Sequence, residues 1–184
     1  INRLIDDIKN DPYGRRKIVS LWQETDLRET PGLAPCAFQT IWNVRNDNHK
    51  HLGRGEGYLD MMLVQRSGDM LTASGPGGIN EIQYAVLLMM VARHTGYKPG
   101  VFTHIVANEQ IYDRHIDTAM EMKKRYKDEE RKESDETLTI NHLDARPMLI
   151  LNENKTNFYD FTIEDFFMVN YNPIKPQLKL ELGI

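Results

Sequence analysis

The sequence predicts an α+β fold in which a mixed β-sheet packs on one long buried helix. Strand-like segments outnumber helical ones in the 184 residues, and the two kinds do not alternate regularly. A single, almost wholly apolar helical segment stands near the middle of the chain, where it can cover such a sheet. Because a chain of this length normally forms one hydrophobic core, we expect residues 1–184 to form a single domain.

Three segments have the character of helices. The segment INRLIDDIKND has its apolar side chains on one helical face, and Pro12 ends it. The segment NEIQYAVLLMMVARHTG begins at Asn80, a good N-cap residue, ends at Gly96 and is apolar on nearly all sides, so it should be buried. The third segment is EQIYDRHIDTAMEMKKRY. The apolar face of the first helix consists of Leu4, Ile5 and Ile8.

The remaining apolar segments are predicted to be strands. Residues 37–45 and 57–67 are the strongest candidates, and the polar segment 46–56 between them is typical of a hairpin connection. The breaker cluster TASGPGG is predicted to be a loop, and the mixed-charge run KDEERKESDE a solvated helix end or surface loop. Weaker strands are predicted at residues 15–22, 100–108, 146–152, 165–171 and 177–184.

The composition is that of a soluble globular protein, with 40% hydrophobic and 27% charged residues. The net charge of −4 gives no electrostatic reason to expect a nucleic-acid or membrane partner. No stretch approaches the roughly 20 apolar residues of a membrane span. A single cysteine is typical of a reducing compartment, so we expect a cytoplasmic protein.

The one cysteine, Cys36, lies in the segment GLAPCAFQTIW, directly before a predicted strand. A lone cysteine forms no intramolecular disulfide, so Cys36 is either a small packed apolar side chain or a nucleophile. Most free cysteines are simply packed, and the neighbouring residues alone do not decide between the two interpretations.

Two further segments carry groups suited to an anionic ligand. Arg15 and Arg16 are adjacent, and adjacent side chains on an extended chain point to opposite sides. They therefore hold one phosphate together only where the backbone bends, and are otherwise solvated surface charges. The segment QRSGD ends a predicted strand before a glycine-rich loop, a place that commonly carries ligand-binding groups. Its polar residues are Gln65, Arg66, Ser67 and Asp69.

The glycine-rich segment SGPGGIN fits neither the dinucleotide-binding fingerprint nor the P-loop pattern. We expect it to allow a close backbone approach and to lead into the helix at Asn80. Asn80 either caps that helix or recognises a base, since its carboxamide both donates and accepts hydrogen bonds. His49 and His51 have no cysteine or carboxylate at ligand spacing, so no metal is expected.

Together these segments resemble the thymidylate synthase family, in the family's order and over essentially the whole chain. Pro35-Cys36 matches the proline–cysteine pair that opens the family's catalytic strand. Upstream, NDPYGRRKIVSLW resembles the double-arginine segment, and downstream LVQRSGD resembles the phosphate-binding strand. GINEIQYAVLLMMVARHTG is similar to the asparagine-led core helix, and YDFTIEDFFMVNYNP to the C-terminal segment. Each motif is ordinary alone, but five in one order are specific.

The resemblance implies a reaction that uses the cysteine. In the family, a thiolate adds to carbon six of the uracil of dUMP, and carbon five then attacks methylene-tetrahydrofolate. Elimination and hydride transfer from the folate give dTMP and dihydrofolate. Cys36 would be the nucleophile, and Arg66 would both hold the phosphate and favour the ionised thiol. Methylene-tetrahydrofolate is a co-substrate, and no metal is implied.

The resemblance also implies how the phosphate is held. Ser67 would bind it together with Arg66, while Arg15 and Arg16 would reach in from the partner subunit of a homodimer with shared sites. A face of the sheet would form the dimer interface. A bent backbone at that interface would remove the difficulty posed by two adjacent arginines.

The other implied contacts concern the base, the sugar and the folate. Asn80 would pair with the uracil edge, donating to the carbonyl and accepting from the ring N–H, a pattern that cytosine does not offer. Gln65 belongs to the same dUMP-binding strand. Gln110 falls where the family has a histidine that contacts the sugar, and Tyr112 matches a tyrosine at the sugar hydroxyl. Asp69 matches an aspartate that contacts the folate.

Departures from the family leave two alternative functions open. Ala37 replaces the usual histidine after the cysteine, and the end LELGI differs from the family's small apolar tail. A glutamate, an arginine and a tryptophan of the family's N-terminal portion have no counterpart, and the chain opens on Ile1, so we expect that portion to be missing from it. The alternatives are a pyrimidine nucleotide hydroxymethylase on the same scaffold and a non-catalytic nucleotide-binding fragment.

Overall fold

The computed structural model describes residues 1–29, 31–32, 34–46, 57–75, 77–135 and 147–181. The chain divides into two compact units. The first comprises Ile1–Gln110 with Thr156–Asp160, and the second Ile111–Lys155 with Phe161–Ile184. The expectation of a single domain stays a prediction.

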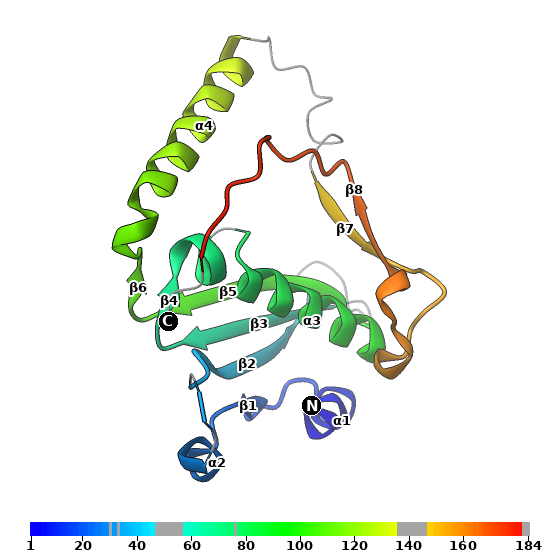
Figure 1. The fold of residues 1–184 in the computed structure, drawn as a ribbon. Helices are drawn as coiled ribbons and strands as arrows, with labels where there is room; N and C mark the ends of the chain where they lie inside the picture. The colour runs from blue at the N-terminus through cyan, green and yellow to red at the C-terminus, as the bar shows by residue number, and fades with distance from the viewer. Residues whose placement is uncertain (30, 33, 47–56, 76, 136–146, 182–184) are drawn as a thin grey trace. The chain divides into compact units, whose positions relative to one another are not determined.

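The first unit is built on a four-stranded sheet with the order β1-β2-β3-β5 (Figure 1). Its strands are β1 (Ile18–Ser20), β2 (Ala37–Arg45), β3 (Tyr58–Gln65) and β5 (Lys98–Val106). The first three strands pair antiparallel, whereas β3 and β5 are parallel. The sheet is therefore mixed, as the sequence predicts, and β2 and β3 form the predicted hairpin. Their connection, with His49 and His51, lies outside the described residues.

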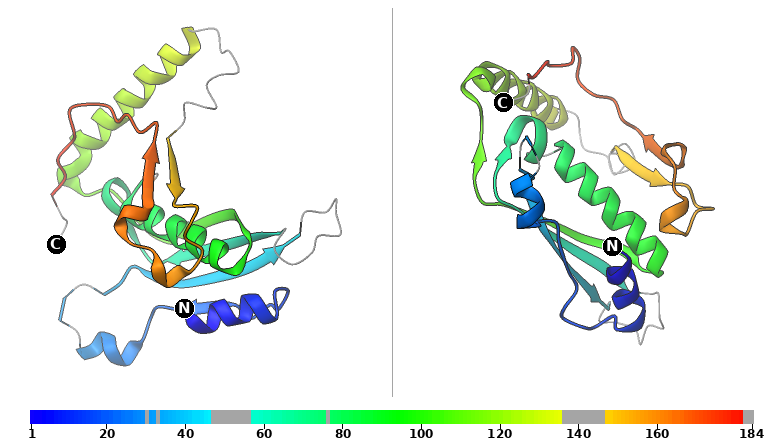
Figure 2. Two further views of the ribbon diagram at one scale, coloured as in Figure 1. Left: turned by 90° about the vertical axis from the view of Figure 1, so that its right-hand side faces the viewer. Right: turned by 60° about the horizontal axis from the view of Figure 1, so that its bottom comes forward.

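Alternating side chains divide this sheet into a core face and an outer face. Along β2, Thr40, Trp42 and Val44 are buried, while the residues between them are exposed. The helices α1 (Asn2–Asn10) and α3 (Ile79–Thr95) pack on the core face, and α3 lies along β3 and β5 (Figure 2). The prediction of an α+β fold with a long helix on a mixed sheet is confirmed.

The two core helices follow the sequence prediction closely, with corrections at the start of α3. The three predicted apolar residues of α1 are all buried. Gly96 ends α3 in the left-handed conformation, with φ of 79°, as glycine allows. The N-cap, however, is Gly78, so the predicted cap role of Asn80 is wrong. Ile79 and Ile82 are 69% and 53% exposed, and the buried residues of α3 are Leu88, Val91 and Ala92, so the prediction that the helix is buried on nearly all sides is wrong.

Short elements connect the sheet to α3. A two-stranded ladder joins β4 (Gly68–Asp69) to β6 (Glu109–Gln110), and a π-helical turn, η1 (Met70–Ser74), follows β4. The predicted loop at residues 72–78 is thus partly helical. The short helix α2 (Glu24–Glu29) lies in a segment for which the sequence predicted no element.

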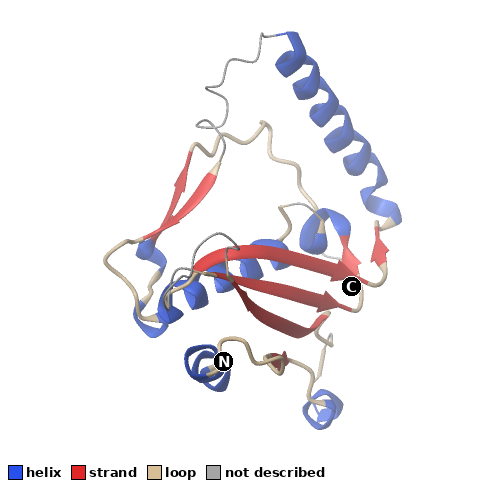
Figure 3. Ribbon diagram, turned by 180° about the vertical axis from the view of Figure 1, so that it is seen from behind, coloured by secondary structure: helices blue, strands red, loops and turns tan. Residues whose placement is uncertain are grey.

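The second unit contains a long helix and a separate hairpin-like pair of strands (Figure 3). The helix α4 (Ile116–Asp135) begins after a 3₁₀ turn, η2 (Asp113–His115), rather than at residue 109 as predicted. It includes residues 127–135 of the mixed-charge run, so this part of the run is a helix end, as one of the two predictions had it. The strands β7 (Met148–Leu151) and β8 (Phe166–Val169) pair antiparallel.

The strand predicted at the C-terminus does not form in the described residues 177–181. Asn170 has a positive φ of 58°, which turns the chain after β8. Just before residue 177, the Pro176 carbonyl accepts a hydrogen bond from Arg125 Nη1 at 2.7 Å. No helix among the described residues is both long and apolar enough to cross a membrane.

Candidate active site

Cys36 lies one residue before β2, opposite the end of β3. In the antiparallel register Ala37 faces Gln65, and the backbone N–H of Arg66 donates to the Cys36 carbonyl at 2.9 Å. The cysteine is half-buried and its thiol is free. The hairpin thus brings the segments PC and QRS, about 30 residues apart in the sequence, into direct contact.

The guanidinium of Arg66 holds the loop that carries the cysteine. Its Nη2 donates to the Ala34 carbonyl at 2.8 Å and its Nε to the Pro35 carbonyl at 3.2 Å. Its Nη1 donates to Ser67 Oγ at 3.0 Å. Trp22 lies beneath it, with its ring centroid 5.9 Å from the guanidinium carbon, a contact that the sequence did not predict.

A hydroxyl connects this guanidinium to the sulfur. Ser67 Oγ accepts from Arg66 and lies 4.0 Å from Cys36 Sγ, toward which it can donate its one proton. A hydroxyl that accepts a hydrogen bond from a cation becomes a better donor, because linked hydrogen bonds polarise one another. Arg66, Ser67 and Cys36 thus form a series of contacts that ends at the sulfur.

Gln65 occupies the centre of a buried polar network on the core face of the sheet. It is fully buried, and its Nε2 donates to the Ser67 carbonyl at 2.7 Å. Its Oε1 accepts from Asn80 Nδ2 at 3.1 Å and lies 3.1 Å from His104 Nε2, which carries the proton in this arrangement. His104 was missed from the sequence, although alternation along β5 places it on the core face with Phe102.

Asp69 and Gln110 face each other across the β4–β6 ladder. The Asp69 carboxylate accepts from the Leu71 N–H at 3.1 Å and from Thr72 Oγ1 at 2.6 Å, so it caps the π-helical turn. Gln110 is exposed. Tyr112 belongs to the second unit, and its sugar contact stays a prediction, as do the folate contact of Asp69 and the sugar contact of Gln110.

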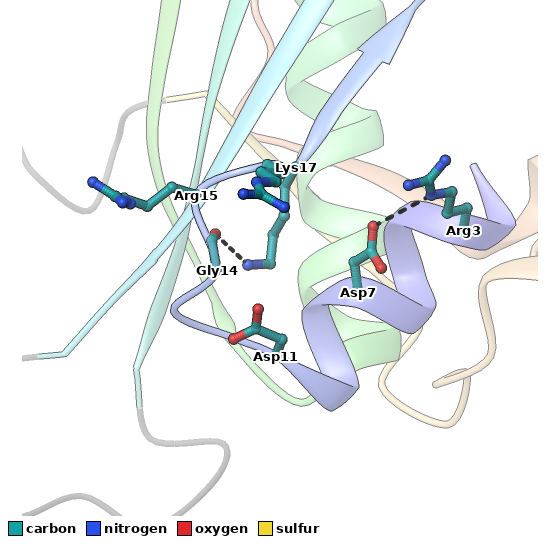
Figure 4. Close-up of a pocket in the computed structure, with 7 residues that line it drawn as sticks. Arg3, Asp7, Asp11, Gly14, Arg15 and Lys17 are labelled. Atoms are coloured by element: carbon teal, nitrogen blue, oxygen red, sulfur yellow. Dashed lines mark hydrogen bonds and ion pairs between the residues drawn. The ribbon is translucent and has the colours of Figure 1, made fainter.

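Arg15 and Arg16 lie apart from this cluster. Both are exposed and both line one cavity of about 340 Å³ beside α1 (Figure 4). Within the described part of the chain their side chains make no hydrogen bond or ion pair, and none connects them to Cys36. They are thus free to bind an anion, and the structure adds a buried neighbour that the sequence analysis missed, Lys17.

A family model described as thymidylate synthase matches residues 1–184. The chain belongs to the thymidylate synthase family. The thymidylate synthase of Lactococcus lactis subsp. lactis is 42% identical to it over the whole of this chain and 58% of that protein. The thymidylate synthase of Streptococcus pneumoniae (strain ATCC 700669) is 41% identical over the same shares of the two chains.

A solved structure agrees with the sequence comparisons. The thermostable thymidylate synthase A from Bacillus subtilis matches 96% of this chain with a TM-score of 0.71 and 32% identity, and the match covers 53% of that structure. The chain thus spans 58% of the length of the curated thymidylate synthases that it matches. The family predicted from five ordered motifs is confirmed, while the roles of individual residues stay predictions.

Proposed function

We propose that this chain carries the nucleotide-binding and nucleophilic part of a thymidylate synthase. The reaction is the reductive methylation of dUMP to dTMP, with methylene-tetrahydrofolate supplying both the carbon and the hydride. The observation that carries the proposal is the contact of Cys36 with Ser67 and Arg66 in a chain that matches the family along its whole length.

In this proposal Cys36 is the nucleophile. Its thiolate adds to carbon six of the uracil, and the displaced electron pair makes carbon five the nucleophile that attacks the methylene group of the folate. The Ser67 hydroxyl, held by Arg66, stabilises the sulfur while it is negatively charged. Loss of the proton on carbon five and elimination of tetrahydrofolate leave an exocyclic methylene group. Hydride transfer from the tetrahydrofolate to that methylene expels the Cys36 thiolate and gives dTMP and dihydrofolate.

Asn80 recognises the uracil in this proposal because its amide is oriented. The Ser67 carbonyl can only accept, so it fixes Gln65 with Nε2 toward Ser67 and Oε1 toward Asn80. That oxygen in turn takes one N–H of Asn80. The second N–H and the Oδ1 of Asn80 remain, and they match the uracil carbonyl and ring N–H, whereas cytosine presents the reverse pattern.

The phosphate is assigned to Arg66 and Ser67, together with Arg15 and Arg16 of a second copy of the chain. The outer face of the sheet supports such a homodimer. Ile18 pairs with Ile41 on this face, and these two with Val101 and Ile105 are between 37% and 55% exposed. Contiguous apolar surface of this kind is typical of a subunit interface. Asp69 remains the proposed folate contact.

The test is mass spectrometry of the natural full-length protein after incubation with fluoro-dUMP and methylene-tetrahydrofolate. We expect a covalent adduct that maps to Cys36 and is absent from Cys36→Ser. A matched control is Ser74→Ala, which removes a hydroxyl bonded to Glu109 and leaves the three residues of the sulfur chain in place.

The outcome also separates the alternative functions. Unmodified protein that still binds dUMP would overturn the proposal in favour of a non-catalytic nucleotide-binding module. If the adduct forms, product analysis decides between dTMP with dihydrofolate, which we expect, and a hydroxymethyl nucleotide with tetrahydrofolate, which would indicate a hydroxymethylase.

A further inference from the structure

Two adjacent arginines line one cavity. Arg15 and Arg16 both line the cavity of about 340 Å³ beside α1, although neighbouring side chains on an extended strand point to opposite sides. The backbone bends at Arg15. What holds the bend decides whether both guanidinium groups can bind one anion.

Backbone contacts define the bend on either side of the arginines. Before them, the Gly14 N–H donates to the Asp11 carbonyl at 3.1 Å and closes a turn after α1. A Cβ at Gly14 would lie only 2.1 Å from Asp11 Oδ2, so glycine permits this close approach. After them, the Ile18 N–H donates to the Arg16 carbonyl at 3.1 Å.

The side chain of Lys17 closes this bend from inside the molecule. Its Nζ donates to the Gly14 carbonyl at 2.6 Å (Figure 4). This contact joins the residue before the two arginines to the residue after them. The Lys17 backbone carbonyl accepts from the Trp42 N–H at 2.9 Å, which ties the segment to β2. Lys17 is 3% exposed, so it is a mostly buried member of the cavity lining, whereas Arg15 and Arg16 are exposed.

We propose that Lys17 is a positioning residue for the double-arginine anion grip. Its buried ammonium fixes the Gly14 carbonyl and so keeps Arg15 and Arg16 exposed over the same cavity. This inference rests on the proposed function, in which the two arginines hold the phosphate of dUMP. Because the guanidinium groups are already placed before the nucleotide arrives, binding loses less conformational entropy.

Two carboxylates make the buried ammonium tolerable. Burial lowers the pKa of Lys17, while the negative charges of Asp11 and Asp7 act in the opposite direction. Asp7 also lies 3.8 Å from Arg3 on the adjacent turn of α1 (Figure 4). Asp7 and Asp11, which also line the cavity, thus stabilise the charge of Lys17, and Arg15 and Arg16 remain available for an anion.

The test compares the natural full-length protein with Lys17→Met, measuring the affinity for dUMP and for deoxyuridine, which lacks the phosphate. We expect Lys17→Met to raise the Kd for dUMP about tenfold, which corresponds to about 1.4 kcal/mol, and to leave the Kd for deoxyuridine unchanged. At saturating dUMP, kcat should stay at the wild-type value. Lys17→Arg, which keeps the cation, should recover most of the affinity. Lys98→Met, at an exposed position, is the matched control and should change neither Kd.

The double variant Arg15→Ala/Arg16→Ala separates this inference from the proposed function. If it leaves the Kd for dUMP unchanged, the phosphate role of the arginines fails, and the Lys17 inference fails with it. If it weakens dUMP binding while Lys17→Met does not, only the Lys17 inference is overturned. Lys17→Met should add no further loss in the double-variant background.

A purely structural role of Lys17 gives a different result. Equal weakening of dUMP and deoxyuridine binding, or an additional loss in the double-variant background, would overturn the inference. Should Lys17→Met fail to fold, Lys17→Gln is measured in the same way, because its shorter amide no longer reaches the Gly14 carbonyl as the ammonium does. The same selective loss of dUMP affinity is expected for it.

Discussion

Replacing Gln65 with methionine tests the buried network beneath the cysteine. The substitution keeps the length of the side chain and removes the amide, which makes polar contacts of 2.7, 3.1 and 3.1 Å with Ser67, Asn80 and His104. At a net value of about 1 kcal/mol for each lost hydrogen bond, the expected loss is about 3 kcal/mol. The polar partners left without Gln65 add to it, since Gln65 itself is 0% exposed.

The assay is equilibrium urea unfolding at one protein concentration, with dUMP and dCMP affinities measured on the same samples. We expect the midpoint to fall with an unchanged slope and the preference for dUMP over dCMP to shrink, because Asn80 loses the contact that orients its amide. Gln83→Met, at an exposed position of α3, is the control and should change stability by less than about 0.5 kcal/mol. A loss below about 1 kcal/mol for Gln65→Met would refute the network as a source of stability.

Three further substitutions have distinct expected outcomes. Gly78→Ala puts a Cβ 2.6 Å from backbone atoms of the π-helical turn, so the start of α3 should shift. We expect the free energy of unfolding to fall by about 1–3 kcal/mol and dUMP binding, measured by calorimetry, to weaken. Unchanged dUMP binding would contradict this. Gly96→Ala, at a φ of 79°, should cost about 1–2 kcal/mol in urea unfolding without affecting dUMP binding. Hydrogen bonds from the Thr162 N–H and the Asn152 amide lower the pKa of Asp165, so its ionised form contributes stability above about pH 4 that is lost as the pH falls through the lowered pKa. Asp165→Asn should therefore flatten the fall in Tm below about pH 4, and an unaltered Tm profile would disprove the linkage.

The parts of the fold that the sequence predicted are those governed by local periodicity. The apolar spacing of α1, the alternation in β2 and β3 and the glycine that ends α3 each act within one element. The prediction of secondary structure failed where the conformation depends on a contact with a residue far along the chain. The segment 177–181 alternates as a strand would, yet it forms no strand in the described residues. The neighbouring Pro176 carbonyl binds Arg125, a contact that no local pattern predicts.

Five of the predicted site residues lie in contact, but the sequence did not predict the hydrogen bonds that connect them. These residues are Cys36, Gln65, Arg66, Ser67 and Asn80. In a continuous strand, the side chains of Arg66 and Ser67 would lie on opposite faces. Because β3 ends at Gln65, before both residues, this alternation does not apply to them, and their side chains form a hydrogen bond. A register shift between Ala37 and Gln39 accompanies this junction on β2. Capping the helix was one of the two roles considered for Asn80, but α3 begins at Ile79, so Asn80 lies inside the helix and its amide donates to Gln65 instead.

Gln65 and Lys17 are both buried polar side chains that donate a hydrogen bond to a backbone carbonyl. Gln65 is buried beneath Asn80, and Lys17 beneath the arginine pair; each spends its polar atoms on a backbone carbonyl and leaves the residue above it free for the nucleotide. Burying an amide or an ammonium opposes folding unless its bonds are made, so apolar residues would be expected there if stability alone mattered. The two burials should differ in their dependence on charge: the carboxylates of Asp7 and Asp11 act on Lys17, whereas the hydrogen bonds of Gln65 involve no carboxylate. Raising the salt concentration should therefore alter the effect of Lys17→Met on dUMP affinity more than that of Gln65→Met. The arginine pair would then depend on charge interactions, and Asn80 on hydrogen bonds.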